Sequence, residues 1–495
     1  MIQLSTVQRV AKNTGIIISG DLIFRLVSLA VTIYLARYLG KVGFGKYNFV
    51  FAYLAFFNII TDLGLQTILV REMAREPTRA PKLIGNAYII RWILTALAVA
   101  SSIIVITLMS YPADTTTYIY IASLTVLFIS FSDFYRTIFE ANLRMEYNIV
   151  AKLAFKGVSA TLILFIIFMK GTLLHIMIAL VFAEMVKTSL NYLFSRKFVK
   201  PRFEIDFGLW EYLFKEALPL ALSSVIWVIY YRIDVVMLSV MMGDAEVGLY
   251  SAAYKLCDPL SLIPGALTMS LFPVMSASFK TSRRKLEQSY RLSFKYLFII
   301  TLPIAIVVSL LSDKIIMMIY DAEFAGSAIA LKILIWGLVF ASGNAIFGSL
   351  LTAIGKQKLG TYITALCAFG NITLNLILIP RMNYTGASIA SVITAFLAFI
   401  MSFYFVSKNF QRVPLHRISA KPFISGLIMA VFIYFFDINM FLLILCATVI
   451  YSLSLLFLET FTEEDVEVFE KLTGRDMRWV LKWRNVMINK IMGNK

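Results

Sequence analysis

Charged residues inside long apolar segments are the positions of this sequence best suited to chemistry. An ionisable side chain in lipid is costly unless it is paired or faces a polar cavity, so each one is a functional candidate. The basic candidates for substrate binding are Arg25, Arg232 and Lys255. A guanidinium presents a planar fork of donors that binds phosphate oxygens in pairs, so the arginines favour an anionic ligand such as a pyrophosphate.

The acidic candidates are expected to couple the protein to an ion gradient, because buried carboxylates can bind a proton or Na⁺. They are Asp62, Asp234 and Asp21. Asp62 has only Asn58 and Gln66 one helical turn away. Arg232 and Asp234 lie two residues apart, on nearly opposite sides of a helix. Asp62 and Arg232 are therefore expected to need a partner from another helix, an ion or a substrate.

Several charged residues, including some of these candidates, have an opposite charge three or four positions away, which is equally consistent with a structural role. These groups are Asp21 with Arg25, Asp133 with Arg136 and Glu140, Glu184 with Lys187, and Lys255 with Asp258. Lys332 has no such neighbour, but it lies near the outer end of its apolar segment, where its ammonium group can reach water.

No metal site, disulfide, cofactor or catalytic residue is expected. The three cysteines, Cys257, Cys367 and Cys446, lie in separate apolar segments, and the two histidines, His175 and His416, are far apart. The sequence has no GxxxxGK[ST] phosphate loop, so ATP hydrolysis is not expected to drive the protein. We therefore expect that the protein is not an enzyme.

The elements that must position these residues are membrane-spanning helices. Of the 495 residues, 60% are hydrophobic and 15% are charged, whereas globular chains carry about 25% charged residues. The apolar segments are long enough to cross about 30 Å of hydrocarbon as helices. We predict an all-α polytopic membrane protein with about fourteen spans, at 14–37, 47–70, 86–109, 118–139, 150–169, 173–195, 216–241, 247–275, 294–311, 327–353, 360–379, 386–406, 422–436 and 440–458. Prolines at 259, 264 and 273 are expected to kink the eighth span.

The distribution of basic residues predicts the orientation in the membrane. The loops on the side of both termini hold 34 Lys and Arg, and the opposite loops hold six. Basic residues concentrate on the cytoplasmic side, so both termini are predicted to be cytoplasmic. Because the net charge of +17 lies in short blocks between spans, no nucleic-acid partner is expected. The amino-terminal sequence has no cleavable signal pattern, so the first span is expected to be retained.

One junction between spans occurs twice. Residues 35–47 read LARYLGKVGFGKY and residues 238–250 read LSVMMGDAEVGLY, so that two glycines and a tyrosine recur with an offset of 203. Six spans separate the copies, so both run in the same direction. This predicts a parallel repeat of two six-helix halves, 1–200 and 201–407, around a central cavity. Residues 408–458 would add two helices, and 459–495 would form a cytoplasmic tail.

The repeat also relates the two arginines. Arg25 lies fifteen residues before Gly40 and Arg232 lies eleven before Gly243. The difference of four residues is about one helical turn, so the two arginines are expected on similar faces of equivalent helices. The alternative is that each arginine pairs with a carboxylate of a neighbouring helix.

The stretches LARYLGKVGFGKYNF, DLGLQTILVREMAR and RIDVVMLSVMMGDAEVGLYSAAYKL, the last followed by LFPVMSAS, carry a family resemblance. Over spans 1–12 the sequence resembles the polysaccharide-transporter branch, similar to O-antigen and oligosaccharide flippases, of the multidrug/oligosaccharidyl-lipid/polysaccharide flippase superfamily. The resemblance implies a cell-membrane flippase that moves a lipid-linked oligosaccharide or polysaccharide precursor to the outer leaflet by alternating access. It also implies a fold similar to multidrug antiporters and a cationic cavity.

Other interpretations remain open. A cation-coupled multidrug or small-metabolite antiporter would share the fold, but its cavity would favour acidic and aromatic residues. A scaffold or scramblase-like protein would have no reason to carry charges inside its spans, and no external catalytic loop favours a membrane enzyme. Besides the lipid-linked substrate and membrane lipids, the expected partners are Na⁺ or H⁺ and glycan-assembly enzymes.

The tail has two features of its own. Thr462 and Asp465 have the spacing of a capping box. The basic stretch 475–491, which includes Trp479 and Trp483, has apolar residues at helical spacing. This pattern favours a helix on the anionic inner leaflet, and a solvated tail is the alternative.

Overall fold

The computed structural model describes residues 6–462 and residue 465, with the side chains of 6–26 and of Lys280 outside the description. All regular secondary structure in this part of the chain is helical, which confirms the predicted all-α class. The α-helices are α1 (Thr6–Asn58), α2 (Leu65–Arg75), α3 (Ala80–Leu108), α4 (Ala113–Ala141), α5 (Glu146–Phe168), α6 (Leu173–Ser195), α7 (Phe207–Met242), α8 (Asp244–Cys257), α9 (Leu262–Thr281), α10 (Arg283–Leu310), α11 (Ser312–Ile319), α12 (Ser327–Leu334), α13 (Trp336–Ala353), α14 (Gln357–Asn409), α15 (Leu415–Phe435) and α16 (Met440–Phe457).

Twelve helical segments of the described residues are long and apolar enough to cross a membrane. Two of them contain a residue with non-helical backbone angles. Gly40 lies in α1, which holds the first predicted span and the first half of the second, and Asn383 lies in α14, which holds the eleventh and twelfth. The twelve segments therefore accommodate the fourteen predicted spans. The thirteenth span is longer than predicted, because α15 begins at Leu415 and runs for 21 residues.

The second and eighth spans are interrupted. Short 3₁₀ turns, η1 (Ile59–Thr61) and η3 (Asp258–Ser261), end α1 and follow α8. The break in span 8 lies at Pro259 and agrees with the predicted kink. The break in span 2 was not predicted, and its chemistry is described with the site below.

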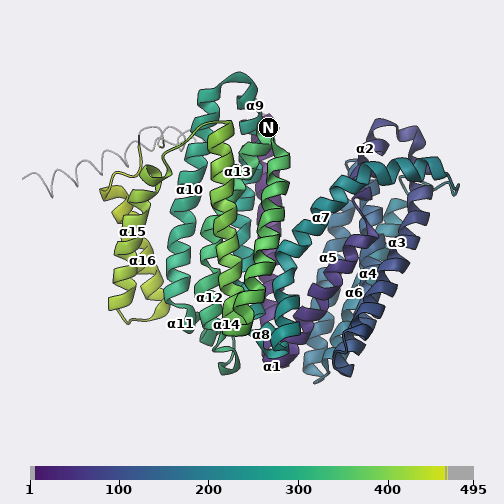
Figure 1. The fold of residues 1–495 in the computed structure, drawn as a ribbon, viewed down its shortest axis with the longest axis horizontal. Coiled ribbons are helices and arrows are strands. Elements are labelled where there is room, and N and C mark those ends of the chain that lie inside the picture. The colour runs from purple at the N-terminus through teal and green to yellow at the C-terminus, as the bar shows by residue number, and fades with distance from the viewer. Residues whose placement is uncertain (1–5, 463–464, 466–495) are drawn as a thin grey trace, which may run out of the picture. The chain divides into compact units, whose positions relative to one another are not determined.

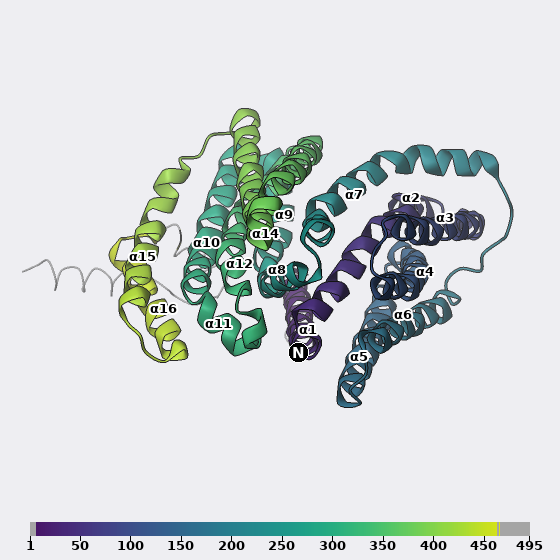
Figure 2. The same ribbon diagram turned by 60° about the horizontal axis from the view of Figure 1, so that its bottom comes forward.

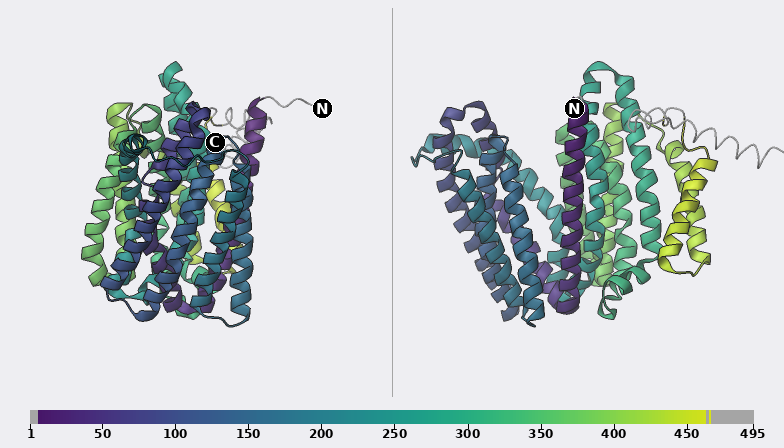
Figure 3. Two further views of the ribbon diagram at one scale, coloured as in Figure 1. Left: turned by 90° about the vertical axis from the view of Figure 1, so that its right-hand side faces the viewer. Right: turned by 180° about the vertical axis from the view of Figure 1, so that it is seen from behind.

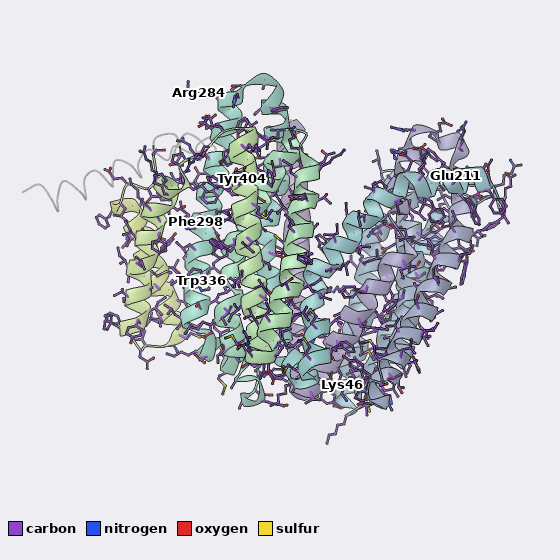
Figure 4. The ribbon with its side chains drawn as sticks, in the orientation of Figure 1. Lys46, Glu211, Arg284, Phe298, Trp336 and Tyr404 are labelled. Atoms are coloured by element: carbon purple, nitrogen blue, oxygen red, sulfur yellow. The ribbon has the colours of Figure 1, made fainter. Side chains whose placement is uncertain are left out.

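The chain divides into two compact units. Unit 1 holds the residues up to Ala252 together with Thr364–Ala387. In unit 1, α4 packs against α3 and α6, and α6 packs against α5 (Figures 1 and 3). One core cluster joins α2, α3, α4 and the start of α7, with Leu69, Ile84 and Phe134 buried. Lys46 and Glu211 mark opposite ends of this unit (Figure 4).

Unit 2 holds Ala253–Ile363 and the residues from Ser388 onward. Its helix α10 packs against α9, α13 and α15, and α15 pairs with α16 (Figures 1 and 2). Leu302, Met429 and Tyr451 are buried between α10, α15 and α16, and the Tyr451 hydroxyl donates to the Ile299 carbonyl at 3.0 Å. Phe298 and Trp336, labelled in Figure 4, pack against the core of this unit. The two carboxyl-terminal helices are therefore held by α10.

Half of the predicted capping box is present beyond α16, because Asp465 accepts from the Thr462 amide, whereas the Asp465 amide donates to the Thr462 carbonyl and not to its hydroxyl. The Asp465 carboxylate accepts hydrogen bonds from the Thr462 amide at 2.7 Å and from the Thr462 hydroxyl at 2.9 Å. It also accepts from Lys295 and Tyr296 of α10. The residues predicted to form the membrane-surface helix, 475–491, lie outside the described part of the chain.

The repeated junction has the same backbone geometry in both copies. Gly40 has φ 65° and ψ 176°, and Gly243 has φ 92° and ψ −177°. This region of backbone space is accessible essentially to glycine alone. The two glycines that the sequence places at equivalent positions are therefore needed for the turn, as predicted.

The two junctions also contact each other, and the contact is reciprocal. A Cβ atom on Gly45 would lie 1.7 Å from the carbonyl oxygen of Asp244, and one on Gly248 would lie 1.9 Å from that of Lys41. Gly248 and Asp244 are the residues 203 positions after Gly45 and Lys41. A two-fold axis relates surfaces in this way, with residue i contacting j and j contacting i. The contact supports the parallel relation of the two junctions, while the extent of the halves and the central cavity between them remain predictions.

Candidate functional site

Unit 1 contains a cavity of about 290 Å³ that brings several charged side chains together. Its walls come from α1, η1, α2, α3, α4 and α7. The lining residues are Ala55, Asn58, Ile59, Thr61, Asp62, Leu63, Gly64, Gln66, Arg91, Asp133, Ser224, Trp227, Val228 and Arg232. Two predicted site residues, Asp62 and Arg232, are therefore lining residues of one cavity. A hollow in unit 2, lined by Gly265, Thr268, Met269, Phe272, Ala345, Gly348, Ser349 and Thr352, contains no ionisable side chain.

The break in span 2 places Asp62 on the cavity wall. Its carboxylate accepts hydrogen bonds from the backbone amides of Gly64 at 3.1 Å and Gln66 at 3.2 Å. Aspartate commonly stabilises a chain turn and the start of a helix in this way. Gly64 has φ 80°, and a Cβ there would lie 2.8 Å from Cβ of Leu220 on α7. The glycine therefore allows α7 to approach the turn closely.

Arg91 of α3 is the partner that Asp62 was predicted to need. Its Nη1 lies 2.7 Å from Asp62 Oδ1 and donates to the Thr61 carbonyl at 2.7 Å, while Nε donates to the Ser130 carbonyl at 3.1 Å. Arg91 is 3% exposed, and the Asp62 side chain is 32% exposed. Sequence reasoning missed Arg91, although it too has no opposite charge three or four residues away. Asp62 remains a candidate for ion coupling, but its carboxylate is already paired with the Arg91 guanidinium.

A second polar network lies beside the cavity. Arg136 lies 3.3 Å from Asp133 and 3.3 Å from Glu140, as the sequence spacing predicted. Gln66 joins the network, since its amide oxygen accepts from Arg136 at 2.8 Å and its amide nitrogen donates to Glu140 at 3.0 Å. These charges largely satisfy one another, and Asp133 also lines the cavity.

Arg232 and Asp234 lie in different environments on α7. Arg232 is exposed in the cavity lining, and no hydrogen bond or ion pair joins its guanidinium to another side chain or carbonyl that the structure describes. Asp234 is 6% exposed and accepts from the Tyr250 hydroxyl at 2.9 Å and the Asn375 amide at 2.6 Å. The prediction that the two side chains point to opposite sides of the helix is confirmed. Arg232 is thus a cation available to a ligand.

The other predicted residues are not part of this lining. Asp21 and Arg25 belong to α1, but their side chains lie outside the described part of the structure. Lys255 is half-buried in unit 2. Glu184 and Lys187 form the predicted local pair, at 2.7 Å. Lys332, in α12, is exposed.

Comparison with known sequences gives relatives named for polysaccharide and glycan biosynthesis. The polysaccharide biosynthesis protein family model matches residues 10–279, and the MatE model matches residues 219–377. A probable low-salt glycan biosynthesis flippase of Haloferax volcanii is 24% identical over 37% of this chain. A capsular polysaccharide biosynthesis protein of Staphylococcus aureus is 20% identical over 81% of this chain and all of its own length. The chain spans 39% of the Haloferax protein and 31% of another curated relative.

Comparison with solved structures concerns the fold. The lipid II flippase MurJ, in an inward closed conformation, aligns with 93% of this chain and 100% of its own, with a TM-score of 0.75 and 16% sequence identity. The two chains therefore share a multi-helix membrane fold. Since the polysaccharide biosynthesis model covers more than half of the sequence, including both repeated junctions and every described cavity-lining residue, the chain belongs to the polysaccharide biosynthesis protein family.

Proposed function

We propose that the protein is a flippase that moves a lipid-linked oligosaccharide or polysaccharide precursor from the cytoplasmic to the outer leaflet by alternating access. The observation that carries the proposal is Arg232, a cavity cation with no protein counter-ion among the described residues. Such a charge is costly between apolar helices and is retained where a ligand compensates it. Family membership and the flippase among the relatives support the same activity.

The anionic part of the substrate accounts for the cation. Lipid-linked glycan precursors carry a phosphate or pyrophosphate between lipid and sugar, and a guanidinium binds phosphate oxygens with two parallel hydrogen bonds. The cavity also offers Asn58, Gln66 and Ser224 as polar groups. By the repeat, Arg25 supplies a second cation from the equivalent helix, and Lys255 is proposed as a third.

Ion coupling is proposed to involve carboxylates that can change their occupancy by a proton or Na⁺. Asp234 is the strongest candidate because its carboxylate is buried and accepts hydrogen bonds from the Tyr250 hydroxyl and the Asn375 amide. Asp62 is a weaker candidate because Arg91 neutralises it, and Asp21 remains a candidate from sequence. The protein is proposed to lie in the cell membrane with both termini cytoplasmic and to work beside glycan-assembly enzymes.

A second candidate function is a cation-coupled multidrug or small-metabolite antiporter of the same fold. The MatE match over residues 219–377 favours it. The uncompensated guanidinium opposes it, since a cationic drug in this cavity would be repelled.

Transport in proteoliposomes separates the two functions. A fluorescent lipid-pyrophosphate-oligosaccharide and a fluorescent lipophilic cation are each reconstituted with the purified protein, with and without a Na⁺ or H⁺ gradient. The proposal predicts translocation of the glycolipid and no efflux of the cation. Gradient-dependent efflux of the cation without glycolipid movement would support the antiporter and overturn the flippase.

A further inference from the structure

Trp227 has an unusual position for a tryptophan in a membrane helix. It lies on α7, in the wall of the cavity, and 55% of its surface is exposed. Tryptophan is enriched where a membrane meets water, yet Trp227 is fifteen residues before the end of α7, about 22 Å along a helix. Its position is therefore explained by the cavity rather than by the membrane surface.

The ring of Trp227 is held as a platform. Tyr231, one turn further along α7, packs against it with ring centroids 4.4 Å apart and an angle of 33° between the planes. An aromatic pair of this kind stabilises the indole in this orientation by about 0.5–1.5 kcal/mol. A fixed aromatic face on a cavity wall is suited to a flat, weakly polar ligand surface.

The cavity places this platform beside the phosphate-binding cation. Arg232 is five residues after Trp227 on α7, and Trp227, Val228 and Arg232 all line the same cavity. A molecule bound in this cavity can meet the guanidinium with its phosphate and the indole with its sugar.

A second, independent feature points to a hydroxylated ligand. The side-chain oxygen of Asn58, a lining residue, is buried and has no hydrogen-bond partner among the described atoms. A buried acceptor left in this state costs about 1–3 kcal/mol. A sugar hydroxyl would satisfy it, because sugars combine an apolar C–H face with donors around the ring.

We propose that Trp227 and Asn58 form a subsite for the sugar ring next to the phosphate, so that the protein selects glycosylated over bare lipid pyrophosphate. The inference rests on the proposed flippase function and adds a chemical criterion for its substrate. The ring face stacks on Trp227, a hydroxyl donates to Asn58 and the phosphate oxygens pair with Arg232. The phosphate end then points toward the outer end of α7.

Binding measurements on the purified full-length protein test the subsite. The probes are a short-chain prenyl pyrophosphate and the same molecule carrying one N-acetylhexosamine. Wild type should bind the glycosylated probe about tenfold more tightly, the effect of a well-placed aromatic contact. In Trp227→Leu the ratio of the two dissociation constants should fall to about one, while Trp227→Phe should retain most of the preference.

Trp92→Leu is the matched control. Trp92 is a half-exposed tryptophan of α3 that packs on Phe131 at 4.6 Å and is not among the cavity-lining residues. It should keep the tenfold ratio. Binding of both probes with no preference for the sugar, or equal loss of preference in Trp92→Leu, would overturn the subsite and leave the flippase proposal standing. Failure of wild type to bind either pyrophosphate would overturn the flippase proposal and the subsite with it.

Discussion

Alanine in place of Gly45 is predicted to push apart the two junction turns of unit 1. The new Cβ would lie 1.7 Å from the Asp244 carbonyl oxygen, whereas close C···O contacts are about 3.3–3.6 Å long. Both atoms are fixed to backbone, so no change of rotamer can relieve the overlap, and the turns must separate by roughly 1.5 Å. Overpacking costs about 1–3 kcal/mol, and a clash between backbones belongs at the upper end, about 3 kcal/mol.

The reciprocal geometry makes a stronger prediction for two substitutions together. Gly248→Ala should cost about the same as Gly45→Ala, because its Cβ would lie 1.9 Å from the Lys41 carbonyl oxygen. Once the Cβ of one alanine has separated the two turns, the Cβ of the second alanine overlaps less with the carbonyl oxygen opposite it. The double variant should therefore be more stable than the sum predicts, by about 1–2 kcal/mol, within the usual range for residues in contact.

The assay is the midpoint of thermal unfolding of the purified protein in detergent. Each single variant should unfold roughly 6–12 °C below wild type, because about 3 kcal/mol shifts the midpoint by about 2–4 °C per kcal/mol for a unit of this size. Gly157→Ala is the control, because a Cβ at Gly157 in α5 meets nothing within 4 Å. Midpoints equal to the control, or strictly additive losses in the double variant, would refute the reciprocal contact.

Three further predictions follow from the geometry. Arg91→Met should lower stability by about 3 kcal/mol because it leaves the Asp62 carboxylate without its ion-pair partner. Adding Asp62→Asn should recover part of the lost thermal midpoint, and no recovery would argue against the ion pair. Gly243→Ala should cost about 1–2 kcal/mol by backbone strain alone, since its Cβ meets nothing within 4 Å, and an unchanged midpoint would contradict this. Burial raises the pKa of Asp465, but the hydrogen bonds it accepts outweigh burial and hold the pKa below its usual value. The contribution of Asp465 to stability is therefore present at neutral pH and lost as the pH falls below about 4. Protection of the Thr462 amide from hydrogen exchange should then fall with pH in wild type and should not do so in the Asp465→Asn variant. The same pH profile of protection in both proteins would refute this prediction.

Hydrophobic length predicted the spans because each helix must cross the same thickness of hydrocarbon. The prediction was less accurate at ends where basic residues belong to the helix. Arg417 and Lys421 lie in the first two turns of α15, and a hydropathy criterion excludes them although their long side chains can reach water. The start of the thirteenth span was therefore placed seven residues too late.

Turn chemistry was the second source of error. Span 2 was predicted as one continuous helix, but Asp62, Leu63 and Gly64 break it. The signal was present as an aspartate two residues before a glycine, a pattern typical of turns. The repeated junction was easier to find because glycine at Gly40 and Gly243 is dictated by the backbone itself.

The site could be predicted only in part. Asp62 and Arg232 were identified as charges without a local partner, and both line the cavity. Which helix supplies the partner depends on tertiary packing, so Arg91 could have been suspected but not paired from sequence. Asp133 was assigned to a local ion-pair group, and that group is present, yet its position on the cavity wall depends on how α4 packs.

The most direct test of the flippase account is the rate at which reconstituted protein moves a fluorescent lipid-pyrophosphate-oligosaccharide across the bilayer when Arg232 is changed. Arg232→Gln should lower the rate at least tenfold, about the effect of losing one charged hydrogen-bonding group at a ligand, and Arg232→Lys should retain an intermediate rate. Lys332→Gln, which removes an exposed cation away from the cavity lining, should flip as wild type does. A wild-type rate for correctly folded Arg232→Gln protein would contradict the assignment of this cavity to the substrate.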